Sequence, residues 1–246
     1  MDLKRLGWVA CVALAATSCA LPPAVTPEDP PLVEDGEETP LRPGGLSAEQ
    51  HQTLRAGGRV EQFVELDRQG KRYVGGLSYA LIRAEPRQVF EVLNQLATLS
   101  QVIPSTRNTR VLDRTGNWVR VELEQGNSMV STTFTVFFEL EPPEGRDDPH
   151  VVRFWLDPSA PHSIDDAWGF FRATRYDAQH SLVSVGALIN LGPGVLRMLF
   201  EQRIQRSILR MPNRIRDTVE RTFQPAAVAS EAPDPVSSTR APESGR

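Results

Sequence analysis

Asp157, His162, Asp165 and Asp166 form the densest group of residues in this chain that could bind a metal or move a proton. Imidazole and carboxylate groups do both, and two adjacent carboxylates raise one another's pKa when they are buried together. The same short segment contains two prolines, which is typical of an exposed loop whose polar side chains are simply hydrated. The sequence therefore predicts no catalytic residue and no metal ligand.

Motifs for cofactor chemistry are missing from the sequence. It contains no phosphate-binding loop, no dinucleotide-binding glycine pattern, no nucleophile elbow and no His-Glu-x-x-His zinc motif. The net charge is -4, and basic and acidic residues are nearly balanced between positions 46 and 225. Since nucleic-acid-binding domains are strongly basic, we predict neither a nucleic-acid partner nor a cofactor.

Arginines crowd the end of the folded part, where an apolar repeat at helical spacing predicts one long helix over 195–223. They could bind the anionic head group of a lipid or of a membrane, because the guanidinium fork fits phosphate. The simpler interpretation is a solvated face, since the chain has only two lysines and arginine fills most basic positions. We favour that interpretation for all of these arginines: Arg197, Arg203, Arg206, Arg210, Arg214, Arg216 and Arg221.

The first 18 residues have the order of a secretion signal: Lys4 and Arg5, then an apolar run, then small residues. The run is too short to span a bilayer. Its end, Ala16-Thr-Ser-Cys19, resembles the lipobox of bacterial lipoproteins. That resemblance implies cleavage before Cys19, a diacylglycerol on its sulfur and, with Ala20 following, an outer-membrane protein facing the periplasm. The alternative is cleavage elsewhere, which leaves an unlipidated secreted protein.

Three further regions follow the signal peptide. Residues 19–45 are predicted to be a lipidated cysteine with a proline-rich tether, because residues 26–41 carry six acids without any base and such a stretch stays solvated. Residues 46–225 are long enough for one domain. Residues 226–246 are rich in Pro, Ala and Ser and are predicted to be a disordered tail. The tether's acids are Glu28, Asp29, Glu34, Asp35, Glu37 and Glu38.

Periodicity within the domain predicts an α+β fold, with a curved antiparallel sheet wrapped around the long C-terminal helix. Pro212 should kink that helix between Ile208 and Met211. A capping-box pattern at Ser47 opens a first short helix, and two more short helices follow the early strands. Strands are expected at 60–66, 73–82, 109–113, 118–124, 130–140, 151–156, 167–176 and 182–190, and the two short helices at 86–97 and 99–103.

Three stretches carry a family resemblance: Ile82 to Leu93, Leu99 to Leu112, and Gly169-Phe-Phe-Arg together with Gly192-Pro-Gly. They resemble the START-like or helix-grip superfamily, which includes polyketide cyclases and coenzyme Q-binding proteins. The resemblance spans roughly residues 59–223. It implies a cavity between the sheet and the terminal helix that holds an apolar ligand.

Aromatic and aliphatic residues on the predicted strands would line such a cavity. The alternative is that they fill the core completely, since alternating aromatic residues usually serve packing. We predict an exported, lipid-anchored protein that binds or transfers a lipid or other hydrophobic small molecule, rather than an enzyme. The alternatives are a cyclase- or aromatase-like enzyme and an envelope interaction module with a filled core. The expected ligand-binding residues are Phe134, Val136, Phe138, Phe154, Trp155, Phe170 and Phe171.

Overall fold

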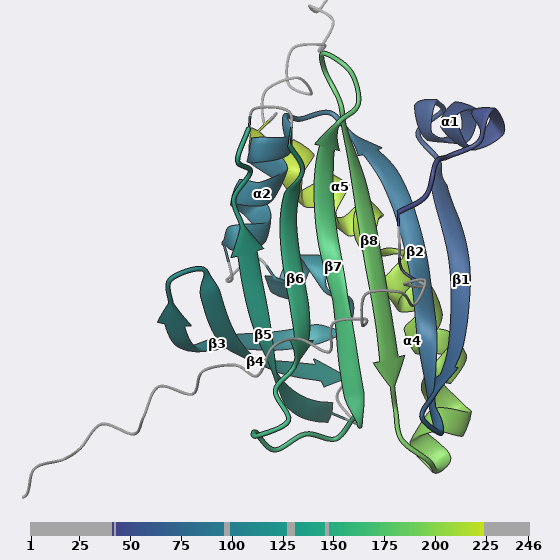
Figure 1. Cartoon of the computed structure of the whole chain (residues 1–246), viewed down its shortest axis with the longest axis vertical. Helices are drawn as coiled ribbons and strands as arrows, with labels where there is room; N and C mark the ends of the chain where they lie inside the picture. Colours follow the sequence, from purple (N-terminus) through teal and green to yellow (C-terminus); the bar gives the residue numbers. More distant parts are fainter. Residues whose placement is uncertain (1–40, 42, 96–98, 127–130, 146–147, 224–246) are drawn as a thin grey trace, which may run out of the picture.

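Eight antiparallel strands form one sheet that curves around the C-terminal helices (Figure 1). The computed structural model describes residues 41, 43–95, 99–126, 131–145 and 148–223. The strand order is β1-β2-β8-β7-β6-β5-β4-β3, so β1 and β3 are the edges. The strands are β1 (Arg59–Arg68), β2 (Lys71–Ile82), β3 (Thr106–Thr115), β4 (Trp118–Gly126), β5 (Ser131–Glu141), β6 (His150–Leu156), β7 (Asp166–Arg175) and β8 (Ser181–Asn190).

The helices lie where their start signals predict them. Ser47 caps the first helix, with its hydroxyl accepting from the Gln50 backbone N–H and the Gln50 side chain accepting from the Ser47 backbone N–H. The predicted α+β helix-grip fold, with its short helices after the early strands, is confirmed. The helices are α1 (Ala48–Arg55), α2 (Pro86–Asn94), α3 (Leu99–Val102), α4 (Val195–Leu209) and α5 (Met211–Phe223).

The C-terminal helix is interrupted where Pro212 predicts a kink. Helix α4 ends at Leu209 and α5 begins at Met211, so the helix predicted over 195–223 is divided into two segments at the expected kink. Proline lacks the N–H that would continue the hydrogen-bond ladder, although it is tolerated in a first helical turn. The Arg210 N–H donates instead to the Ser207 carbonyl at 3.2 Å. The break lets the two helical segments cover different parts of the sheet.

Strand alternation divides the sheet into an inner and an outer face. Inward-pointing residues such as Val121, Val185 and Phe171 are buried with α2 and α5 in one large core cluster. Outward-pointing residues of β1, β2, β7 and β8 form a second cluster beneath Leu41 and the α1 residue Leu54. Both faces of this part of the sheet are therefore covered.

Gly75 and Gly76 let α4 approach β2 closely. Their φ angles are +158° and +152°. A Cβ on Gly76 would meet the Gln62 carbonyl oxygen at 2.1 Å and the Leu209 side chain at 3.1 Å. The Gln205 side-chain amide on α4 donates to the Gly75 carbonyl at 3.1 Å. A larger residue at either position would collide with the neighbouring strand, and at position 76 also with Leu209 of α4. The glycine pair therefore allows α4 to lie close to β2.

Within the described residues, no helix has the length and apolar character needed to cross a membrane. The signal peptide, Cys19, the acidic tether up to residue 40 and the C-terminal tail lie outside the described residues. The predictions made for those segments therefore stay predictions.

Candidate functional site

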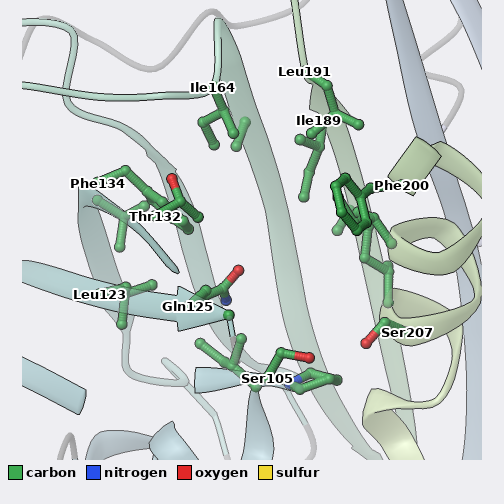
Figure 2. Close-up of a pocket in the computed structure, with 18 of the residues that line it drawn as sticks. Ser105, Leu123, Gln125, Thr132, Phe134, Ile164, Ile189, Leu191, Phe200 and Ser207 are labelled. Carbon is green, nitrogen blue, oxygen red and sulfur yellow. The ribbon is translucent and has the colours of Figure 1, made fainter. Parts of the chain in front are cut away.

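A cavity of about 300 Å³ lies between the inner face of the sheet and α4 (Figure 2). Its long wall comes from β5, where Phe134, Val136 and Phe138 follow one another on the inward-facing side. The opposite wall is α4, which presents the partly buried side chains of Phe200 and Ile204. The remaining apolar lining is Ile103, Leu123, Phe154, Ile164, Ala167, Phe171, Ala187, Ile189, Leu191, Ile208 and Met211.

Small residues on the two central strands leave this space unfilled. Ala167 on β7 and Ala187 on β8 point inward where larger residues would reach toward α4. Gly169 on β7 pairs with Ala187, and a Cβ there would meet the Phe154 ring at 2.7 Å. The ring therefore lies against the bare backbone of β7 and leaves the middle of the cavity open.

The cavity opens at a polar rim. Four of its lining residues are exposed to solvent, namely Ser105, Ser131, Ser163 and Arg203. The hydroxyl groups of Thr132 and Ser163 contact each other across one side of this rim. Apolar walls with a few polar groups at one end are the usual construction of a site for an amphipathic small molecule.

Gln125 and Ser105 form the rim beside the β4–β5 hairpin, and Figure 2 shows Ser207 on the α4 side. The Gln125 side-chain amide donates to the Thr106 hydroxyl at 3.3 Å. Ser105 adopts a left-handed backbone conformation with φ +61°, and its carbonyl accepts from the Gly126 N–H at 2.9 Å. Non-glycine residues adopt this conformation at a cost of about 1–3 kcal/mol, which local contacts must offset. The rim is thus held in place by its own hydrogen bonds.

Five of the seven residues predicted to line a cavity do line it. Trp155 and Phe170 do not, because each points to the outer face of the sheet. Trp155 packs against Trp118 with ring centroids 4.9 Å apart, and Phe170 packs in the outer cluster with Leu77. Adjacent strand residues point to opposite faces, so a pair such as Phe154 and Trp155 cannot share one cavity. The five lining residues are Phe134, Val136, Phe138, Phe154 and Phe171.

The polar rim was not recognised in the sequence, although one strand carries a signal for it. Inward positions of β4 run Val119, Val121, Leu123 and then Gln125, so a polar residue ends an otherwise apolar register. A polar residue at an inward position needs either a hydrogen-bond partner or solvent. Ser207 and Arg203 gave no comparable signal, because only the position of α4 brings them to the rim.

The acid-rich loop does not form a site. The Nδ1 atom of His162 lies 2.7 Å from the Ile164 carbonyl oxygen, and Asp166 accepts a hydrogen bond of 2.7 Å from the Tyr73 hydroxyl. Asp157 instead pairs with Arg120 at 2.6 Å. In the described part of the chain, no group of three or more His, Cys, Asp or Glu residues is placed to hold a metal ion.

Asp157 is a buried charge held by its neighbours. Burial opposes its ionisation, but hydrogen bonds from the Ser159 hydroxyl and backbone and the charge of Arg120 together keep its pKa below the usual range. The pair lies on the outer face, with Arg120 on β4 and Asp157 directly after the end of β6. The ion pair therefore links β4 to the end of β6 behind the cavity wall.

The model of the family described as polyketide cyclase / dehydrase and lipid transport matches residues 82–216, which is more than half of the chain. The match includes every strand from β3 to β8 and the whole of α4. No curated protein matches the chain.

Solved structures share the fold at low sequence identity. An aromatase/cyclase, Zhui from Streptomyces sp. R1128, is 17% identical with a TM-score of 0.52, covering 68% of this chain and 99% of its own. A STAR-related lipid transfer protein from Xanthomonas axonopodis is 16% identical with a TM-score of 0.51, covering 65% and 98%. Human STARD10 is 8% identical with a TM-score of 0.50, covering 72% and 81%.

Proposed function

Because the chain belongs to the polyketide cyclase / dehydrase and lipid transport family, we propose that it binds or transfers a lipid or other hydrophobic small molecule in the cavity beneath α4. The observation that carries the proposal is an unfilled apolar space that opens to solvent at a polar rim. Burying an apolar ligand there gains roughly 25 cal/mol for each Å² removed from water. The volume of about 300 Å³ lies at the small end of the range for ligand pockets.

Binding is favoured over catalysis by the chemistry of the lining. Among the described residues that line the cavity, Arg203 is the only one with a charged side chain, and a guanidinium group does not exchange protons as a general acid or base. General acid–base catalysis needs a group whose pKa lies near the working pH, and hydroxyl and amide side chains supply none. A cyclase-like reaction in the same cavity is the competing function, and the description of the family includes it. Product formation from a poly-β-ketone substrate by the purified protein would favour that function.

The proposal is tested by what the purified protein carries and takes up. We expect mass spectrometry of a solvent extract to show a co-purified lipid, and a fluorescent fatty-acid probe to bind with saturation. Ala187→Phe places a ring in the cavity and should abolish probe uptake. Val111→Phe adds an aromatic ring at an exposed position of edge strand β3 and serves as the matched control. An empty extract together with no saturable uptake would refute carriage of a hydrophobic ligand.

We also propose that the domain is exported and held at a membrane by a lipid on Cys19, with residues 20–40 as an acidic tether. The lipobox-like sequence supports the anchor, and the proline-rich composition supports an extended tether of about 3 Å per residue. Metabolic labelling with a radioactive fatty acid should label the wild-type protein in bacteria and not the Cys19→Ser variant. Recovery of both proteins in the soluble periplasmic fraction would contradict the anchor.

A further inference from the structure

Four arginines gather in a groove that continues the cavity outward along α4. The groove is lined by Arg203, Arg206, Arg210 and Arg214, together with Gln202. It shares a set of residues with the polar rim of the cavity, so an elongated molecule in the cavity would reach the groove without crossing a barrier. The shared residues are Pro104, Ser105, Arg203 and Ser207.

These four side chains have no internal partner. All are exposed, and within the described residues none of their guanidinium groups makes a hydrogen bond or an ion pair. The other arginines of the two helices are engaged differently. Arg197 pairs with Glu201 at 3.1 Å, Arg216 donates to the Gly57 carbonyl at 2.9 Å, and Arg221 donates to the Gln101 side chain at 3.4 Å.

Pairing is also the usual state of arginines on the strands. Arg110 lies 2.9 Å from Glu122, and Arg72 lies within 3.0 Å of both Glu65 and Glu201. No acidic residue is among the described residues that line the groove. Among the described residues, unpaired arginines are therefore concentrated beside the cavity rim, although Arg55 has only a contact with the Tyr176 ring and the buried Nε atom of Arg172 also lacks a hydrogen-bond partner.

The spacing of the four arginines has an energetic cost. Arg203 and Arg206 lie on neighbouring turns of α4, Arg210 caps the end of that helix and Arg214 lies on α5, and like charges on neighbouring turns of a helix are destabilising. A bound anion would remove this repulsion. Guanidinium groups bind phosphate and carboxylate through parallel hydrogen bonds, which are stronger than those between neutral groups.

We propose that the ligand of the cavity is an anionic amphiphile, whose apolar chain lies beneath α4 and whose phosphate or carboxylate group binds the Arg203–Arg206 end of the groove. This inference rests on the proposed function and specifies its ligand class. Arg203 lines both spaces and therefore stands at the junction of chain and head group. Arg206, one helical turn further on, makes the second contact, and Arg210 and Arg214 raise the local positive potential.

Calorimetric titration with three probes tests this assignment in the purified full-length protein. Decyl phosphate has the chain and the charge, decanol has the chain alone, and inorganic phosphate has the charge alone. We expect decyl phosphate to bind roughly tenfold or more tightly than decanol, as hydrogen bonds to charged groups allow. Inorganic phosphate should show no binding at the same concentrations. The preference for decyl phosphate should shrink at high salt, because exposed charges are screened.

Two double variants distinguish binding by the groove arginines from a general effect of the protein's positive charges. In R203Q/R206Q the affinity for decyl phosphate should fall to that for decanol, while decanol binding is retained. The control R197Q/R221Q removes the same number of charges outside the groove, one from α4 and one from α5, and it should bind both probes as the wild type does. A thermal melt of each variant checks that the fold is retained.

Each other outcome identifies a different error. Equal binding of decyl phosphate and decanol by the wild type, or an equal loss of decyl phosphate in both double variants, overturns the anionic head group but leaves the proposed function standing. Failure of both alkyl probes to bind overturns the proposed function as well. Binding of phosphatidylglycerol vesicles that is lost in R203Q/R206Q, without any preference for decyl phosphate, would assign the groove to a membrane surface instead.

Discussion

The inner face of the sheet meets helices along its length, yet the two ends of that face are filled differently. At one end α2 and α5 bury Val183, Ala173 and Leu140 in solid packing. At the other end the same strands run beneath α4 and enclose a cavity lined by Ala187, Ala167 and other inward residues. Secondary structure is thus the same in both halves, and only side-chain volume and helix position distinguish them.

The filled half explains the stability of the domain. Ile215 and Val219 of α5 and Val89 of α2 have no solvent-exposed surface. Ser181 on β8 donates to the Ala84 carbonyl at 2.6 Å and ties the start of α2 to the sheet. Close packing of this kind removes apolar surface from water and satisfies the polar groups that it buries.

The hollow half is supported from its outer side instead. Trp155, Trp118 and Phe137 form an aromatic cluster on the convex face behind the cavity wall. Arg120 adds an ion pair with Asp157 and lies over the Phe137 ring at 5.9 Å. These contacts support the strands of the cavity wall from the outer face. The difference between the halves can be tested with matched substitutions.

The largest effect is expected from removing a buried side chain in the filled half. Ile215→Ala should lower the free energy of unfolding by about 2–5 kcal/mol, because it leaves a void in rigid surroundings. Ile204→Ala, on the cavity wall, should cost roughly 1–2 kcal/mol, since part of that side chain already faces open space. Urea denaturation measures both, and equal costs would show that the two halves do not differ.

A larger side chain should destabilise the filled half and be tolerated on the cavity wall. Ala173 and Ala167 are both inward-pointing residues of β7, the first in the filled half and the second on the cavity wall. Ala173→Leu should destabilise the protein by about 1–3 kcal/mol through overpacking. Ala167→Leu should leave stability nearly unchanged while weakening uptake of a fluorescent fatty-acid probe. Similar destabilisation by both variants would indicate that the cavity is closed in solution.

The smallest effect is expected from the ion pair between Arg120 and Asp157 on the outer face of the sheet. The pKa of Asp157 in the folded protein is lower than its ordinary 3.8, so its charge stabilises the folded state above that pH. This contribution should be lost as the pH falls through the lowered folded-state value. Urea midpoints measured from about pH 5 to about pH 2 should therefore fall more steeply for the wild type than for Asp157→Asn. Parallel pH profiles of the two proteins would contradict a stabilising contribution from ionised Asp157.

Much of the architecture was predictable because it depends on short stretches of chain. The capping box at Ser47, the strand alternation around Val136 and the break near Pro212 each act on neighbouring residues. These patterns predict the individual elements, and the family resemblance added the cavity between the sheet and the terminal helix. The run Phe154–Trp155 was misread because its register, which decides the inward residue, is set by pairing with β5 and β7.

The sequence by itself determined the order of helices and strands, the break in the terminal helix and the apolar character of the inner face. Only the tertiary structure decided that one end of that face is hollow, because the void depends on Ala167, Ala187 and Ile204 meeting across the fold. It also decided which arginines lack partners, since Arg214 and Arg216 look alike in the sequence and only the fold brings the Gly57 carbonyl to Arg216. Periodicity is local, whereas empty volume and unpaired charge arise between residues that are far apart in the chain.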